Sequence, residues 1–443
     1  MRTNPFASPF IRIACLFPLI LLGSSGCGGT PPAGPGVWDV GLLGAAANGA
    51  AKDTAIFQNA FDSCAKAGGG IVNVPAGTYL IGSVTMGAKT ILHLEQGAII
   101  NGSPDMEDYP LTTVRWEGRW VSGHAGLICA YNADEIGIVG DGTINGNPSV
   151  GGRLNPRAPV LMEFQNCDGV RLGKFSTTEH GIWSIHPVYC QHFLATNLHI
   201  KSTGGNGDGI DIDSCVHAEI TNCDIDTGDD CIAIKSGRGM EGLKANRPSE
   251  DIVISHCRLG DSNFACIGIG SEISAGAKKI RIEDCTFVHS KTASIYIKSR
   301  IGRGSGVEDV VGENLKVIDS TGGFLRINLL NSGLQDSEPV PGEEGIPYAR
   351  NFKFSNITVS GGKFIEAASI SPQKPLDGLV ISHVTGVCSG GMNLANMRNV
   401  ELKDIHITGF DGPELQTSNV TGVGLEGAVP RVAPATSPSG AVN

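Results

Sequence analysis

The residues best suited to chemistry are five aspartates that lie in two clusters near the middle of the chain. The first cluster is Asp208, Asp211 and Asp213, and the second is Asp229 and Asp230. Asp208 and Asp229 stand 21 residues apart, about one repeat of the solenoid folds whose periods begin near 20 residues. A chain coiled with that period stacks the clusters on adjacent turns, where paired carboxyl groups can perform the acid and base steps of glycosidic cleavage.

Each cluster, taken alone, also fits a purely structural role. Gly-Asp-Gly, as around Asp208, is common in turns, and groups of carboxylates bind calcium. We interpret Asp211 and Asp213 as structural residues, namely turn or strand-edge groups that support the site.

The other three aspartates, Asp208, Asp229 and Asp230, would lie together. Three carboxyl groups held together cannot all ionise easily, so one of them is expected to have a raised pKa.

A short pattern recurs from residue 172 onward: an apolar residue, two polar residues, an apolar residue, any residue and an apolar residue. One copy is Ile220-Thr-Asn-Cys223-Asp-Ile225, and clear neighbouring copies are 21 to 34 residues apart. Bent strands at this spacing predict an all-β fold, a parallel β-helix whose inward side chains stack coil upon coil. A leucine-rich repeat is the rival architecture, but its leucine consensus is absent.

The pattern sets the expected limits of the domain. We predict one β-helix catalytic domain over residues 37–425, followed by a disordered Pro/Ala/Ser-rich tail over residues 426–443. Residues 53–67 are the one clear helix, with apolar residues on one face, Asp53 as a possible cap and a GGG stop. A single amphipathic helix before a long β array is typical of a cap over the first coil.

The N-terminal residues indicate export. Residues 1–27 have two arginines, a short apolar core and small residues before Cys27, which predicts a signal peptide. The GSSGC ending favours a bacterial lipoprotein signal with Cys27 as a lipid anchor, and a plain secretory signal is the alternative. Residues 28–36 form a Gly/Pro linker. We therefore expect an envelope lipoprotein or a secreted protein, with no other membrane contact.

Composition excludes several classes. The net charge of −11 argues against nucleic acid as a partner. Thirteen cysteines would suggest disulfides in an exported protein, but Cys223, Cys257 and Cys285 share one apolar position of the repeat. They are interpreted as small buried hydrophobic residues in a column. No C-x-x-C pair occurs, and we predict neither a metal site nor a cofactor.

Several motifs together resemble one known family. NGDGIDIDSC followed by TGDDCIAIKSG is similar to the core of glycoside hydrolase family 28, the polygalacturonases and their relatives. FDSCAKAGGGIVNVPAGTYLIG, WSIHPVYC and IKSRIGRGSGVEDV resemble other family segments, so the resemblance covers roughly residues 37–410. It implies a right-handed parallel β-helix and an inverting hydrolase of α-linked galacturonides in pectic polysaccharide. We expect a monomer.

The resemblance also implies roles for the aspartates. Asp229 corresponds to the general acid that protonates the leaving oxygen. Asp208 and Asp230 correspond to the residues that activate the attacking water. Lys298 corresponds to a residue that binds the substrate carboxylate.

The chain departs from the family pattern at two positions. Phe264 stands where the family has a histidine, and Tyr296 stands where it has an arginine. A single lysine does not reproduce the bidentate grip of an arginine on a carboxylate. Rhamnogalacturonan or another pectin-side substrate is therefore an alternative, and Arg300 or Arg303 is a candidate replacement for the missing cation.

Other residues are expected near the cleft. His186 and Trp183 lie on the coil before the first aspartate motif, and Arg115, Trp116 and Glu117 lie on a longer loop. We predict His186 and Arg115 as substrate-binding residues, and a tryptophan in a groove often stacks on sugar faces. Core packing is the alternative for each of them.

Two other functions compete with hydrolysis. A pectate lyase shares the parallel β-helix but needs calcium and a basic residue that abstracts a proton. A non-catalytic surface glycan-binding protein would explain the departures at Phe264 and Tyr296. The TGDDC motif and its spacing favour hydrolysis over the lyase, and the presence of Asp208, Asp229 and Asp230 argues against a protein that only binds glycan.

Overall fold

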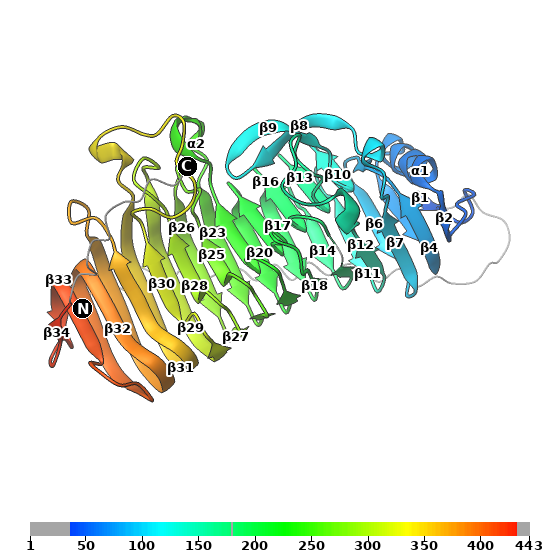
Figure 1. The fold of residues 1–443 in the computed structure, drawn as a ribbon. Coiled ribbons are helices and arrows are strands. Elements are labelled where there is room, and N and C mark those ends of the chain that lie inside the picture. Colours follow the sequence, from blue (N-terminus) through cyan, green and yellow to red (C-terminus); the bar gives the residue numbers. More distant parts are fainter. Residues whose placement is uncertain (1–35, 179, 432–443) are drawn as a thin grey trace, which may run out of the picture. The chain divides into compact units, whose positions relative to one another are not determined.

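Parallel strands wind into a long coil that covers nearly the whole chain (Figure 1). The structure, a computed structural model, describes residues 36–178 and 180–431. The predicted signal peptide over 1–27, its anchor Cys27, most of the 28–36 linker and the end of the 426–443 tail lie outside the described residues. No helix in the described part is long and apolar enough to cross a bilayer.

Three series of parallel pairings run along the coil, as expected for a β-helix. The first series carries the site: β5 (Val84–Met86), β10 (Ile128–Tyr131), β13 (Met162–Gln165), β16 (Ile185–Val188), β19 (Ile210–Asp213), β22 (Ile232–Lys235), β25 (Ala265–Ile269), β28 (Ala293–Lys298) and β30 (Leu325–Asn328). The second comprises β1 (Gly36–Asp39), β3 (Gly70–Val74), β6 (Thr90–Leu94), β11 (Gly137–Gly140), β14 (Arg171–Gly173), β17 (Gln191–Thr196), β20 (Val216–Thr221), β23 (Ser249–Ser255), β26 (Ala277–Glu283) and β29 (Gly306–Ser320). The third comprises β2 (Asn48–Lys52), β4 (Gly77–Ile81), β7 (Ala98–Gly102), β12 (Thr143–Asn145), β15 (Ser176–Thr178), β18 (His199–Lys201), β21 (Asp224–Asp226), β24 (Arg258–Gly260) and β27 (Thr286–Val288).

The coil ends in longer strands that pass through its bends. These are β31 (Tyr348–Ser369), β32 (Leu376–Thr408), β33 (Leu415–Val423) and β34 (Val429–Pro430). The described β-structure therefore runs from Gly36 to Pro430, slightly beyond the predicted limit at residue 425. The predicted right-handed parallel β-helix is confirmed, as an all-β architecture with few helices.

The recurring pattern has a direct structural cause. Its third position is the bend between strands of the second and third series, and there the backbone is left-handed. Asparagine, aspartate and histidine tolerate that conformation better than most side chains. The residues with positive φ at this position are Asn197, Asn222, His256, Asp284, Asn314, Asn356, His383 and Asp404.

Inward side chains stack in columns along the coil. Paired positions on successive strands of the first series hold Ile212, Ile234, Ile269, Ile297 and Ile327, which are all buried. The predicted cysteine column is also confirmed. All eleven cysteines in the described part are buried free thiols.

The N-terminal end is covered by one helix, as predicted. Helix α1 (Thr54–Lys66) buries Phe57 and Phe61 against the first coil. Asp53 precedes it but does not cap it with its side chain. The Asp53 carboxylate instead accepts hydrogen bonds from the backbone of Ala46 and Ala47.

Two elements leave the coil on the side of the site. One is the antiparallel hairpin β8 (Leu111–Trp116) and β9 (Arg119–His124), whose turn at Glu117 and Gly118 has positive φ at both residues. The other is the short helix α2 (Gly239–Ala245), which the sequence pattern did not reveal. Both lie along the same edge of the molecule (Figure 1).

Candidate active site

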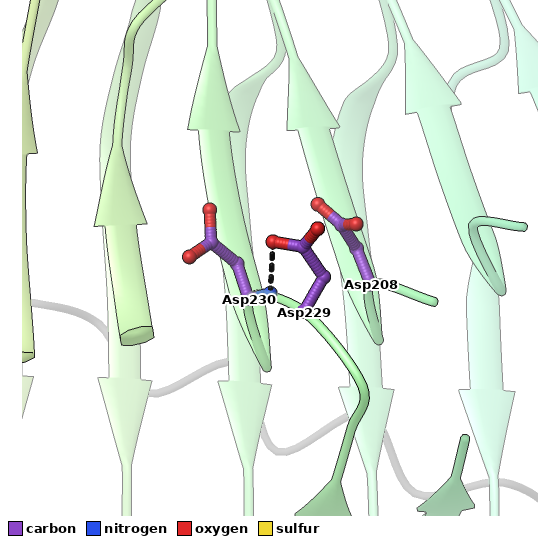
Figure 2. A group of neighbouring side chains, drawn as sticks. All are labelled: Asp208, Asp229 and Asp230. Atoms are coloured by element: carbon purple, nitrogen blue, oxygen red, sulfur yellow. Dashed lines mark hydrogen bonds between the residues drawn. The ribbon is translucent and has the colours of Figure 1, made fainter. Parts of the chain in front are cut away.

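Asp208, Asp229 and Asp230 meet on the outer surface of adjacent coils (Figure 2). Ile210 of β19 pairs with Ile232 of β22, so Asp208 and Asp230, which precede these residues, lie side by side. One carboxylate oxygen of each aspartate lies within 4.8 Å of the others. The structure thus brings together the three residues that the sequence predicted.

Asp230 is held from three sides. Nζ of Lys298 lies 2.7 Å from its Oδ2, and the backbone N–H of Ala265 donates to its Oδ1 at 3.2 Å. Beneath it lies Gly268, where an added Cβ would stand 2.3 Å from Oδ2 of Asp230. The carboxylate therefore occupies space that only glycine leaves free.

Asp229 and Asp208 lie in surroundings that favour the protonated form. Burial and the neighbouring Asp230 raise the pKa of Asp229 above its usual value. Burial, followed by Asp211 and Asp229, raises the pKa of Asp208 well above the usual range. Asn206 Nδ2 lies 3.5 Å from Oδ2 of Asp229, and the backbone N–H of Asp230 donates to its Oδ1 at 3.0 Å.

Lys235 lines the cavity and lies between the carboxylates of Asp211 and Asp208. Its Nζ lies 3.1 Å from Asp211 Oδ1, 3.8 Å from Asp208 Oδ2 and 4.6 Å from the centre of the Trp183 ring. Burial opposes the charged form, but Asp211 and Asp208 raise the pKa of Lys235 well above its usual value. Burial raises the pKa of Asp211 to about 6. Asp211 thus supports the site by holding Lys235, but it does so as a buried residue within β19 rather than as the predicted turn or strand-edge group.

His186 and Arg115 do not reach the cavity, although the sequence predicted both as substrate-binding residues. Both side chains are buried behind it and contact Asp213: Arg115 Nε lies 3.2 Å and His186 Nε2 lies 3.8 Å from Asp213 Oδ2. Arg115 lowers the pKa of Asp213 against the effect of burial. We therefore assign the pair to the support of the cleft rather than to contact with substrate.

The cavity above the aspartates has a volume of about 220 Å³. Its lining includes Asp208, Asp229, Asp230, Lys235, Lys298, Trp183, Glu117, Arg153, Phe264 and Leu334. The spacing of the three carboxylates would also suit a cation. Lys235 and Lys298 already place two ammonium groups beside them, which favours proton transfer as the role of the cluster.

One wall of the cavity is a loop fixed by a buried aspartate. Asp336, in the loop between β30 and β31, accepts from Arg238 at 2.6 Å, Arg303 at 2.8 Å and Arg119 at 3.2 Å. Arg303 is fully buried in this contact, and Arg300 donates to the backbone oxygen of Gly333. Neither arginine is therefore placed to replace the missing substrate-binding cation.

A different arginine stands beside the position where the family arginine is absent. Arg326 of β30 pairs in register with Tyr296 of β28, and its guanidinium lies 5.1 Å from the centre of the Tyr296 ring. It is half-buried, and it has no ion pair with any residue in the described ranges. Phe264 directly precedes β25, the neighbour of β28 on the side away from Arg326. The centre of its ring lies 4.3 Å from Nζ of Lys298.

Comparison with known proteins settles the family. The sequence profile of glycosyl hydrolases family 28 matches residues 64–423. The chain belongs to glycosyl hydrolases family 28. A "Probable polygalacturonase" of Vitis vinifera is 30% identical to this family 28 chain in an alignment of 363 residues that covers 77% of this chain and 72% of the relative. The chain is accordingly a glycoside hydrolase.

Solved structures share the fold. A family 28 exopolygalacturonase of Yersinia enterocolitica matches with a TM-score of 0.77 and 21% identity, covering 90% of this chain and 79% of that one. An exopolygalacturonase of Thermotoga maritima matches with a TM-score of 0.70 and 24% identity, covering 84% of this chain and 93% of that one. Both similarities support the β-helix architecture of this family 28 chain.

Two contributors to the site, Lys235 and Gly268, and one arginine near it, Arg326, were missed in the sequence. Lys235 ends strand β22, which begins two residues after Asp230 and lies in the segment IAIKSG. A charged residue on the outward side of that strand could have been predicted to lie beside the aspartates. Gly268 offered none, because a glycine in an apolar strand does not reveal what lies above it. Arg326 is found only through the register of β28 and β30, which depends on loop lengths.

Proposed function

We propose that the protein hydrolyses α-linked galacturonide bonds in pectic polysaccharide, with inversion at the anomeric carbon. The observation that carries the proposal is the cluster of Asp208, Asp229 and Asp230, with Lys298 in contact with Asp230. Family membership and the relatives named as polygalacturonases support a galacturonan substrate. The alternative of a rhamnogalacturonan substrate has no comparable support.

The geometry suggests a division of roles. Asp229, whose pKa is raised by burial, keeps a proton for the leaving oxygen. Asp230, paired with Lys298, is the carboxylate that takes the proton of the attacking water. Asp208, in register with Asp230 but with a pKa raised well above the usual range, orients that water rather than accepting its proton.

Inversion requires a water between the catalytic carboxyl groups. Such groups are usually about 6.5–9.5 Å apart in inverting enzymes and about 5–5.5 Å apart in retaining ones. One oxygen of each carboxyl group lies within 4.8 Å of the others, which is a closest approach and not the separation between the groups. We propose inversion because Asp208 and Asp230 offer two carboxyl groups that can hold one water.

Arg326 and Lys298 are the proposed partners of the substrate carboxylates. Arg326→Ala should raise KM on polygalacturonate about tenfold with kcat little changed, because a hydrogen bond from a charged group is lost equally from ground and transition states. The effect should disappear on methyl-esterified pectin, which lacks the charge. If the variant kept the wild-type KM on polygalacturonate, as it should on methyl-esterified pectin, this role would be contradicted.

Lys298→Ala differs from Arg326→Ala because Lys298 also contacts Asp230. It should lower kcat as well as raise KM, since the Asp230 carboxylate would be left without its counter-ion. Arg326→Ala is therefore the matched comparison, and steady-state kinetics of the two variants separate substrate binding from support of the catalytic base.

Activity should depend on pH through Asp229. The general acid works only while protonated, and its raised pKa keeps it protonated above the usual value of about 3.9 for aspartate. Turnover should therefore fall as the pH rises through the raised pKa of Asp229. A kcat profile at saturating substrate measures this limb, and turnover that does not fall at high pH in a stably folded protein would contradict the assignment.

The direct test of function uses polygalacturonate as substrate. Hydrolysis should release new reducing ends in the presence of chelator. Unsaturated products that vanish with chelator would instead identify a lyase, and binding without new reducing ends would identify a glycan-binding protein.

We also propose that the protein is exported and that Cys27 is lipidated. An extracellular substrate agrees with export. Metabolic labelling with a fatty-acid analogue tests the lipidation of Cys27.

A further inference from the structure

We infer that this enzyme removes short units from one end of the polymer, because the groove is blocked beside Asp208 and accessible beyond Lys298. The inference rests on the proposed hydrolysis of galacturonan and adds its mode of action. An enzyme that cuts inside a chain must let the chain leave the site in both directions. One that cuts at an end needs only one exit.

An apolar plug fills the groove on the N-terminal side. Trp116 of β8 stacks on Trp183 with ring centroids 4.1 Å apart, and the guanidinium of Arg157 lies 3.7 Å from the Trp116 ring centre. With Ala158, Val160 and Ile182, the tryptophans form a buried cluster that is separate from the main core. This plug lies outside β13 and β16, on the coils that precede Asp208.

A chain of polar contacts crosses the groove above the plug. Arg153 Nε donates to Asn206 Oδ1 at 2.6 Å on one side, and Arg153 Nη2 lies 3.4 Å from Glu117 Oε1. Glu117 then accepts from Arg238 Nη1 at 3.1 Å on the opposite wall. Asn206, Arg153, Glu117 and Arg238 thus form a bridge from wall to wall, and Glu117 and Arg153 both line the cavity.

The hairpin is firmly placed in this position. The backbone N–H of Trp120 donates to Glu241 of α2 at 3.3 Å, and Arg119 of β9 contacts Asp336 at 3.2 Å. Arg115 of β8 joins buried Asp213 to Glu241. Because these contacts join the hairpin to both α2 and the loop of Asp336, the plug is part of the folded domain.

The opposite end of the cavity is built from accessible side chains. Leu334 at its rim is 58% exposed, and Phe264 is half-buried. The next strand, β30, presents half-buried Arg326, which can bind a uronate of the departing polymer.

The test follows high-mass polygalacturonate with the wild-type protein. Reducing ends, solution viscosity and product sizes are measured together from the earliest time points. We expect one short product to dominate throughout, with little loss of viscosity while reducing ends accumulate. A ladder of intermediate lengths with a rapid fall in viscosity would overturn the inference and leave the proposed function intact. Complete inactivity would overturn the proposed function, and this inference with it.

Two variants test whether the plug is the cause. Glu117→Gln with Arg153→Ala removes the bridge, and Trp116→Ala hollows the plug. Longer products should appear in at least one of them. The matched control, Lys279→Ala with Glu250→Gln, removes another exposed ion pair at 2.7 Å, remote from the cavity, and should keep the wild-type products. Folded, active variants with unchanged products would overturn the role of the plug.

Discussion

Asp229→Asn should lower turnover on polygalacturonate by about two to four orders of magnitude while the fold survives. Asparagine has nearly the shape of aspartate but cannot give a proton to the leaving oxygen. The side chain lies outside the apolar columns of the β-helix, so its replacement leaves the core unchanged. Initial rates of reducing-end release measure the turnover, and circular dichroism of the variant shows whether the fold survives.

Asp224→Asn is the matched control for this prediction. Asp224 lies on the neighbouring strand β21, is partly exposed and pairs with Arg258 at 2.8 Å. Loss of such an exposed pair costs about 0–1 kcal/mol of stability and should not change turnover. Near wild-type activity of the Asp229→Asn protein would remove Asp229 as the general acid.

Gly268→Ala should cost about a hundredfold in kcat, although it adds only a methyl group to a residue that takes no part in the chemistry. The new Cβ would stand 2.3 Å from Oδ2 and 2.7 Å from Cγ of Asp230, so the carboxylate must move. That movement breaks its contact with Lys298, and a displacement of about 1 Å at a reacting group can cost a hundredfold in rate.

The control for Gly268→Ala is Gly173→Ala in β14. An added Cβ at Gly173 would meet no atom closer than 3.6 Å, which is ordinary contact. Its kinetics should stay at the wild-type level. If Gly268→Ala behaved in the same way, Asp230 would not need its observed position for catalysis.

The fold was predictable because its cause repeats. Eight coils place an asparagine, aspartate or histidine at the same bend and an apolar residue after it, so the pattern survives variable loops. Asp208 and Asp230 could be placed for the same reason, since one period of the coil separates them. Their meeting follows from the register of β19 and β22 alone.

The surroundings of the aspartates could not be predicted, because they come from parts of the chain that interrupt the repeat. The hairpin of β8 and β9 folds back so that Arg115 is buried against Asp213 and Trp116 covers Trp183. No local pattern specifies that contact. Arg303 was a plausible partner of the substrate from its position in the sequence, but the distant Asp336 binds it.

The anomeric configuration of the first product tests the central claim most directly. Proton NMR during hydrolysis of an α-linked galacturonide reports that configuration before the anomers interconvert. Direct attack by a water held between Asp208 and Asp230 predicts that the β anomer appears first. Initial appearance of the α anomer would mean that a carboxylate attacks the sugar instead, and would contradict the roles assigned to the three aspartates.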